Sequence, residues 1–254
     1  MRVDRSTLGE RDAAVAPAAR RALSPRFGVT VVSELVDAIV RGAIPAGSTL
    51  PPEAALCEQF GVSRTVIRES VKRLEEKGLV VVAQGRGTLV LPTASWNMID
   101  ETVLSALVAN DETLGVLDDL SHVRATLEGL IARDAARSGD RELIEQLRDA
   151  LELMRDTIGD EPAFNDADVV FHAVVGEMTD NRLADNIVKT LFHQARVSAR
   201  FVRHSELDIT LHEHERVFAA IESGDADAAE AAMRSHILDA WERRRPPAPH
   251  RRLS

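Results

Sequence analysis

The 254-residue sequence has little aromatic character and a single cysteine. Aromatic residues make up 4% of the chain and tyrosine is absent, which argues against a stacking platform for single-stranded nucleic acid. Because Cys57 stands alone, the chain can form neither an internal disulfide nor a thiolate zinc cluster. No apolar run approaches the roughly 20 residues that span a bilayer, and the residues after Met1 lack the apolar core of a signal peptide. We therefore expect a cytoplasmic protein with no membrane partner.

Negative charge dominates the chain, which carries a net charge of −10, but the charge is unevenly distributed. Residues 25–92 hold eight basic and seven acidic residues, whereas residues 93–245 hold 16 basic and 31 acidic ones. Within 63–88 the basic residues outnumber the acidic ones by six to three. A small basic module of this kind can bind DNA if it holds the acidic remainder away from the phosphates.

The length fits one large domain or two modest ones, and hydrophobic residues at 44% are enough for a packed core. Near Pro92 the chain changes from short segments punctuated by Gly and Pro to long segments with a helical period. The two ends lack an apolar period, and we expect them to be disordered. The predicted organisation is a tail at 1–24, a first domain at 25–92, a linker at 93–100, an all-α domain at 101–245 and a tail at 246–254.

The first domain has the order helix, helix, tight turn, helix and β-hairpin. Gly61 can adopt the positive φ of the turn, and Ser63 can cap the helix that follows. Two β-rich runs flank Gln84-Gly85-Arg86-Gly87, which is typical of a hairpin. This order predicts a winged helix-turn-helix. We expect its helices at about 31–42, 51–60 and 64–77, and its strands at 79–83 and 88–91.

Basic residues gather on the third predicted helix and at the hairpin turn. Arg64, Arg68 and Lys72 are spaced four residues apart and therefore share one helix face. In a helix-turn-helix the start of this helix enters the major groove, where Arg can bond guanine O6 and N7. A solvated helix with internal ion pairs is the alternative. The candidate DNA contacts are Ser63, Arg64, Thr65, Arg68 and Lys72 on the helix, and Gln84 and Arg86 at the hairpin turn.

The first domain resembles the DNA-binding domain of GntR-family transcription regulators. The resemblance rests on Ile44-Pro45-Ala46-Gly47-Ser48-Thr49-Leu50-Pro51, on Phe60-Gly61-Val62-Ser63-Arg64-Thr65-Val66-Ile67-Arg68-Glu69 and on Gly85-Arg86-Gly87-Thr88. It implies a homodimeric regulator that binds a palindromic double-stranded operator. This chain has Ala54 where the family often has an Arg after the Glu of the second helix.

The second domain combines a predicted helical bundle with a set of possible metal ligands. Its breaks define six or seven antiparallel helices, so the whole fold is mainly α. Asp168 and His172 lie one turn apart on one helix, and His214 and His236 lie on two later helices. In a bundle these helices can face a common centre, and one carboxylate with three imidazoles suits Zn, Ni or Mn. Histidines that bind no metal are the alternative.

The second domain also resembles the ligand-binding FCD domain of the FadR-type branch of the GntR family. The matching stretches are Asp168-Val169-Val170-Phe171-His172, Glu213-His214 and the run from Gly224 to His236. The resemblance implies that these four positions hold a divalent ion, with Zn first, and that a bound organic acid completes its coordination. It also implies that Arg124 binds the effector carboxylate. An ion pair with Glu128, one turn on, is the alternative for Arg124.

The linker carries a narrower resemblance. Ser95-Trp96-Asn97-Met98-Ile99-Asp100 is similar to the linker of galactonate-type sugar-acid repressors. Taken together, the resemblances imply a transcription regulator, more often a repressor than an activator and not an enzyme, whose operator affinity is controlled by a small organic acid such as a sugar acid. Two alternatives stay open: a metal-sensing regulator with no organic effector, and a metal-dependent hydrolase.

Overall fold

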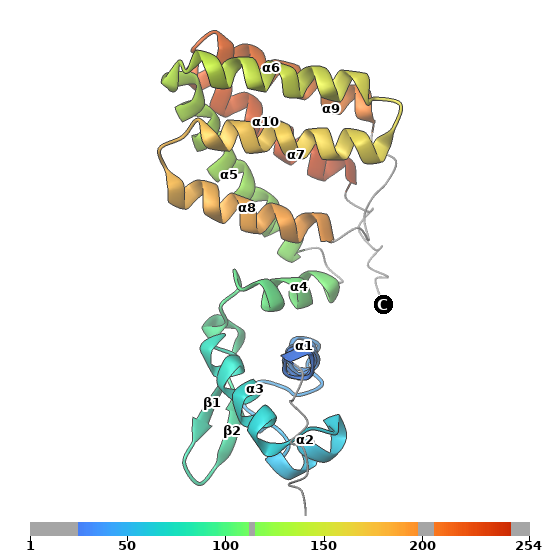
Figure 1. The fold of residues 1–254 in the computed structure, drawn as a ribbon. Coiled ribbons are helices and arrows are strands. Elements are labelled where there is room, and N and C mark those ends of the chain that lie inside the picture. Colours follow the sequence, from blue (N-terminus) through green and yellow to red (C-terminus); the bar gives the residue numbers. More distant parts are fainter. Residues whose placement is uncertain (1–24, 112–114, 198–205, 245–254) are drawn as a thin grey trace, which may run out of the picture.

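The computed structural model describes residues 25–111, 115–197 and 206–244, and both predicted tails lie outside them. These residues form ten α-helices, one short 3-10 helix and a two-stranded sheet (Figure 1). The helices are α1 (Pro25–Val40), α2 (Glu53–Phe60), α3 (Arg64–Glu76), η1 (Thr93–Ser95), α4 (Glu101–Ala109), α5 (Gly115–Ser138), α6 (Arg141–Asp156), α7 (Glu161–Glu177), α8 (Arg182–Val197), α9 (Leu207–Glu222) and α10 (Ala226–Arg244). The strands are β1 (Val80–Ala83) and β2 (Gly87–Val90).

Helices α1 to α3 and the hairpin β1–β2 form the predicted winged helix-turn-helix, which is confirmed. Gly61 has a φ of 63° in the turn between α2 and α3, a conformation that suits a residue without a Cβ. The Ser63 hydroxyl caps α3 by accepting a hydrogen bond from a backbone N–H of its first turn. In the hairpin the strands are antiparallel, with Val80 opposite Val90. The turn at Gly61 and the cap at Ser63 thus fix where α3 begins, and the hairpin forms the wing.

The core of this part is formed by the apolar sides of its helices together with the hairpin. On α3, Ile67 and Leu74 are seven residues apart and fully buried, while the basic residues between them face outward. Leu35 and Val36 on α1 pack into the same core. The apolar side of α3 therefore holds the helix in place and leaves its basic side free for a ligand.

Helices α5 to α10 form the predicted all-α bundle, which is confirmed (Figure 1). Helix α10 packs against α5 and α9, and α6 packs against α7 and α9. One large apolar cluster fills the space between them, with Phe164 and Phe171 of α7 among its largest fully buried side chains. None of the described helices is long and apolar enough to cross a membrane.

Helix α4 lies between the two parts and packs into both (Figure 1). Val103 belongs to the core of the winged part, whereas Leu104 and Val108 join a separate cluster with α5 and α8. The start of α4 is fixed by Asp100, which caps the helix and accepts a 2.6 Å hydrogen bond from Lys77 at the end of α3. The limits of the two domains and of the linker stay a prediction, since α4 belongs to both cores.

The bundle core should be sensitive to loss of volume on α6. Leu147 is fully buried, so we expect Leu147→Ala to lower the free energy of unfolding by about 2–5 kcal/mol through lost burial and a residual cavity. Leu153→Ala on the same helix is the control, because Leu153 is 46% exposed and its loss should change the stability little. Urea denaturation followed by circular dichroism measures both values, and equal losses would contradict the assignment of this core.

Candidate metal centre

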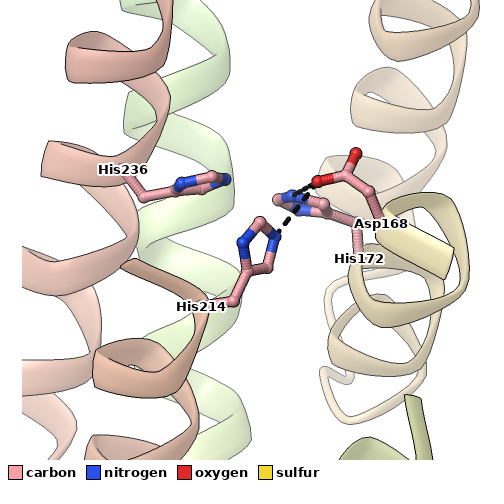
Figure 2. Close-up of side chains that lie close together, drawn as sticks. All are labelled: Asp168, His172, His214 and His236. Carbon is pink, nitrogen blue, oxygen red and sulfur yellow. Dashed lines mark ion pairs between the residues drawn. The ribbon is translucent and has the colours of Figure 1, made fainter. Parts of the chain in front are cut away.

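Three helices of the bundle bring the four predicted ligands together (Figure 2). Asp168 and His172 lie one turn apart on α7 and so project from the same face. His214 comes from α9 and His236 from α10. One possible ligand atom from each residue lies within 4.8 Å of those of the others. The sequence spacing on α7 and the antiparallel packing of the bundle thus create one cluster.

The cluster is compact and largely shielded from solvent. His214 and His236 are buried, and their ring centroids are 4.2 Å apart. The Oδ1 atom of Asp168 lies 3.1 Å from Nε2 of His214 and 3.9 Å from Nε2 of His172. Phe171 packs edge-on against His214 with a centroid distance of 4.7 Å, which closes one side of the site. A carboxylate and imidazole nitrogens therefore converge in an apolar surrounding.

The Nδ1 atom of each histidine in the cluster has an oxygen partner outside it. For His214 the partner is the backbone carbonyl of Thr210, at 2.8 Å. For His172 it is Oε2 of Glu128, at 2.8 Å, and for His236 it is Oε2 of Glu213, at 3.1 Å. A carbonyl and ionised carboxylates only accept hydrogen bonds, so we assign the proton to Nδ1 in the neutral form of each ring. Each Nε2 then carries a lone pair.

The cluster therefore suits a cation. The Nε2 atom of His214 is buried and has no hydrogen-bond partner among the described residues, and a carboxylate oxygen lies 3.1 Å away. A lone pair facing a carboxylate in an apolar site is costly unless a positive charge lies between them. Ligand atoms of a tetrahedral ion with bonds of about 2.1 Å lie about 3.4 Å apart, so the more widely spaced atoms of the cluster would move inward on binding. These residues would hold Zn, Ni or Mn, with Zn favoured by the borderline donor set.

The electrostatics of the cluster keep its carboxylates ionised. Burial alone would raise the pKa of Asp168, but the three imidazoles beside its carboxylate, His214 first, lower it below its usual range. Burial together with the charge of His214 lowers the pKa of His236 to about 3. The Asp168 carboxylate and the neutral His236 ring are the protonation states in which these groups can bind a metal.

Arg124 is tied to the outer side of the cluster. Its Nε and Nη2 atoms lie 3.0 and 2.7 Å from Oε1 of Glu128, which leaves Oε2 of Glu128 for His172. Burial would raise the pKa of Glu128, but Arg124 and His172 lower it to about 2. The ion pair considered as the alternative for Arg124 is thus present. Its role toward an effector stays a prediction.

A cavity of about 240 Å³ opens beside His172, between α5, α7 and α8. Its lining is mostly apolar, and its polar residues are Glu128, His172, Asp185 and Lys189. Lys189 and Asp185 form an ion pair at 2.8 Å on the α8 wall. The size of the cavity fits a small organic molecule, and His172 belongs both to the cavity and to the metal cluster.

The predicted DNA contacts lie on the opposite part of the molecule, along α3 and at the wing. All seven side chains are exposed. Arg68 donates from Nε to both carboxylate oxygens of Glu53 on α2, at 3.1 Å each. Nζ of Lys72 lies 3.9 Å from Oε1 of Glu76, and such an exposed ion pair contributes little in water. The exposed face of α3 therefore offers Arg64 and Lys72 to a ligand and holds Arg68 beside α2.

Sequence reasoning missed Glu213 and Arg243. In the sequence Glu213 is simply the residue before His214, but in the fold it contacts His236 on the next helix. Arg243 follows His236 by seven residues, two helical turns, and therefore lies on the same face of α10. The seven-residue spacing of His236 and Arg243, together with a Glu next to a predicted ligand, could have indicated these two residues.

A winged helix-turn-helix joined to an all-α domain with a buried polar cluster defines a DNA-binding regulator with a ligand-binding domain. Residues 27–90 match the family of bacterial regulatory proteins described as gntR, and residues 119–239 match the FCD domain. The chain is 35% identical over 216 residues to the galactonate operon transcriptional repressor of Escherichia coli strain K12, covering 84% of this chain and 94% of that protein. The chain belongs to the GntR family and is a DNA-binding transcription regulator.

Two further comparisons agree with this family. The Uxu operon transcriptional regulator of Escherichia coli strain K12 is 32% identical over 216 residues, covering 82% of each chain. The solved structure of Lar, which is described as controlling the expression of the Listeria monocytogenes agr system, has a TM-score of 0.55 at 18% identity. It covers 85% of this chain and 95% of that one, and it supports the fold alone.

Removal of one imidazole should abolish high-affinity metal binding. We expect wild-type protein loaded with Zn²⁺ and dialysed to retain about one ion per chain, and His214→Ala to retain far less, because a ligand is lost. His212→Ala is the matched control: His212 is two residues away on α9 but exposed, and it pairs with Glu215. Metal content measured by elemental analysis decides the outcome, and undiminished stoichiometric metal in His214→Ala would contradict the site.

Proposed function

We propose that the chain is a homodimeric transcription repressor whose affinity for a palindromic operator is controlled by a small organic acid bound beside a divalent metal ion. Asp168, His172, His214 and His236 would hold the ion. The observation that carries the proposal is the buried Nε2 atom of His214, which faces the Asp168 carboxylate without a hydrogen-bond partner among the described residues. Since bacterial DNA lies in the cytoplasm, a regulator of this kind would act there.

The charge of the cluster supports an anionic effector. Asp168 supplies one negative charge, and the lowered pKa of His236 keeps that ring neutral. With a divalent ion and neutral rings, the centre would carry a net charge of about +1 in an apolar surrounding, where an anion is attracted strongly. A carboxylate group can satisfy that charge and also occupy an open coordination position. The 240 Å³ cavity beside His172 offers room for the rest of a small acid.

Sugar acids are the first candidates for the effector. Two relatives are named for the galactonate and Uxu operons, and the galactonate operon repressor covers 84% of this chain. The linker residues 95–100 supplied the same indication from the sequence. The hydroxyl groups of a sugar acid would find polar partners among Glu128, Asp185 and Lys189, which line the cavity.

A homodimer fits both the DNA and the protein surface. A two-fold symmetric dimer presents two copies of α3, and this symmetry is mirrored in the half-sites of a palindromic operator. Val123 and Leu130 lie seven residues apart on one face of α5 and are 47% and 38% exposed. An exposed apolar face of this kind favours contact with a second copy.

Substitution on α3 should weaken binding to the operator. We expect Arg64→Ala to raise the Kd for an operator selected from random duplexes by about 5- to 150-fold, which corresponds to about 1–3 kcal/mol for one base contact. Arg137→Ala removes the same charge from the exposed end of α5 and is the control. Fluorescence anisotropy at fixed salt gives both affinities, and an equal loss in both variants would indicate a general charge effect.

A thermal-shift screen of Zn²⁺-loaded protein should identify the effector class. At 100 times its Kd an acid stabilises the folded state by about 2.7 kcal/mol, so a hexonate should raise the melting temperature and a chelator should remove the shift. A response only to lactate-like or dicarboxylic acids would reject the sugar-acid assignment. A response to metal without any acid would favour the metal sensor, and metal-dependent hydrolysis lost in His172→Ala would favour the hydrolase.

The same screen tests Arg124. We expect Arg124→Ala to weaken effector binding by about tenfold, because it removes the guanidinium that pairs with Glu128, a residue that lines the cavity. Arg133→Ala is the control on the same helix, since Arg133 pairs with Asp227 and Glu230 at the surface. Unchanged effector affinity in Arg124→Ala would leave that residue with its ion pair to Glu128 alone.

A further inference from the structure

A second carboxylate outside the cluster, that of Glu213, contacts two residues of α10. Oε2 of Glu213, on α9, accepts a hydrogen bond from Nδ1 of His236 at 3.1 Å. The same carboxylate receives two hydrogen bonds from Arg243, from Nη1 to Oε1 at 2.6 Å and from Nη2 to Oε2 at 2.7 Å. From this arrangement we infer that Glu213, held by Arg243, is a positioning residue that fixes His236 for metal binding. The inference rests on the proposed function.

The contact with His236 fixes both the tautomer and the orientation of the ring. Without an acceptor at Nδ1, the ring can flip about its Cβ–Cγ bond, which exchanges Nδ1 with Cδ2 and turns Nε2 away by exchanging it with Cε1. The hydrogen bond to Glu213 prevents this exchange and keeps the proton on Nδ1, so the Nε2 lone pair stays toward Asp168 and His214. The ring of His236 is also stacked on that of His172, at 25° and 5.4 Å between centroids.

The ion pair with Arg243 explains how the buried Glu213 carboxylate can act as the acceptor for His236. Glu213 is 8% exposed, and a buried carboxylate with one imidazole partner would be costly. Arg243 binds both of its oxygens in a bidentate arrangement, which supplies charge and fixes the plane of the carboxylate. Because Arg243 holds the carboxylate plane, Oε2 of Glu213 stays in place as an acceptor for Nδ1 of His236.

The partners of His172 are arranged in the same chemical order. Arg124 donates to Oε1 of Glu128, and Oε2 of Glu128 lies against Nδ1 of His172. Two histidines from different helices are therefore each held by a carboxylate that an arginine holds in turn. This repetition indicates that the Arg243–Glu213 pair serves His236 and is more than a surface ion pair at the end of α10.

The test compares Zn²⁺ affinities of the full chain, measured by competition with a chromophoric chelator. We expect Glu213→Ala to raise the Kd for Zn²⁺ by about 10- to 100-fold, the usual effect of losing a partner of a metal-bound histidine. Glu215→Ala is the matched control, because Glu215 lies on the same helix, is ion-paired with Arg155 and touches none of the four ligands. We expect its Kd to stay within about twofold of the wild-type value.

Two conservative variants separate positioning from folding. Glu213→Gln keeps a carbonyl oxygen that accepts from His236, so its Kd should lie closer to that of the wild type than to that of Glu213→Ala. Arg243→Lys keeps the charge but not the bidentate contact, and we expect an intermediate Kd. The melting temperatures of the metal-free variants, and the visible absorption of their Co²⁺ forms, show whether the fold is intact and whether the coordination has changed.

The outcomes separate the inference from the proposed function. If the wild-type chain binds no Zn²⁺, the metal site and the inference fail together. If the wild type binds Zn²⁺ and Glu213→Ala binds it equally tightly, the inference alone is wrong and the metal site stands. An equal loss of affinity in Glu213→Ala and Glu213→Gln would also overturn it, because the hydrogen-bond acceptor at His236 would then be irrelevant.

Discussion

The cluster of Asp168 and three histidines depends on which oxygen atoms bind the Nδ1 protons of its imidazole rings. Each proton goes to a different source of oxygen: the backbone of α9, a carboxylate on α5 and a carboxylate on α9. Because all three partners are acceptors, all three Nε2 atoms present lone pairs to one point beside Asp168. The bundle must therefore bring α5, α7, α9 and α10 together to build the cluster, and its apolar core surrounds the cluster on these same helices.

Charge is arranged in two zones around that point. Glu128 and Glu213 lie on the outside and have guanidinium partners, so each pair is close to neutral. Asp168 lies at the centre, where its Oδ1 is close to Nε2 of His172 and Nε2 of His214. A cation at the centre would therefore meet one unneutralised carboxylate, while the outer carboxylates act through the histidines. With a divalent ion bound, the charge at the centre would be that of the ion reduced by the single charge of Asp168.

Local features of the sequence were enough to predict most of the fold. The Ser63 cap, the left-handed turn at Gly61 and the glycine-rich wing are short-range signals, and each occurs where it was expected. The four clustered residues were also predictable, because Asp168 and His172 share a helix face by spacing and the others followed from the family resemblance. These features depend on residues that are close in the sequence or on a known pattern.

Features that join distant parts of the chain were not predictable in the same way. The contact between Glu213 and His236 spans two helices, and nothing in the period of either helix indicates it. The Arg68–Glu53 pair likewise depends on how α2 packs against α3. A single sequence gives the face on which a polar side chain lies but not the partner that packing brings from another helix, as for Glu213 with His236 and Arg68 with Glu53.

Helix α4 links the stabilities of the two halves of the chain. Successive side chains project about 100° apart around a helix, so Val103 enters the core of the winged part and Leu104 enters the cluster with α5 and α8. A helix of nine residues is too short to persist alone in water and relies on burial from both sides. Loss of either core would strip apolar cover from α4 and expose the other core. The DNA-binding half and the helical bundle therefore share part of one free energy of unfolding, and we expect this shared burial on α4 to couple their melting.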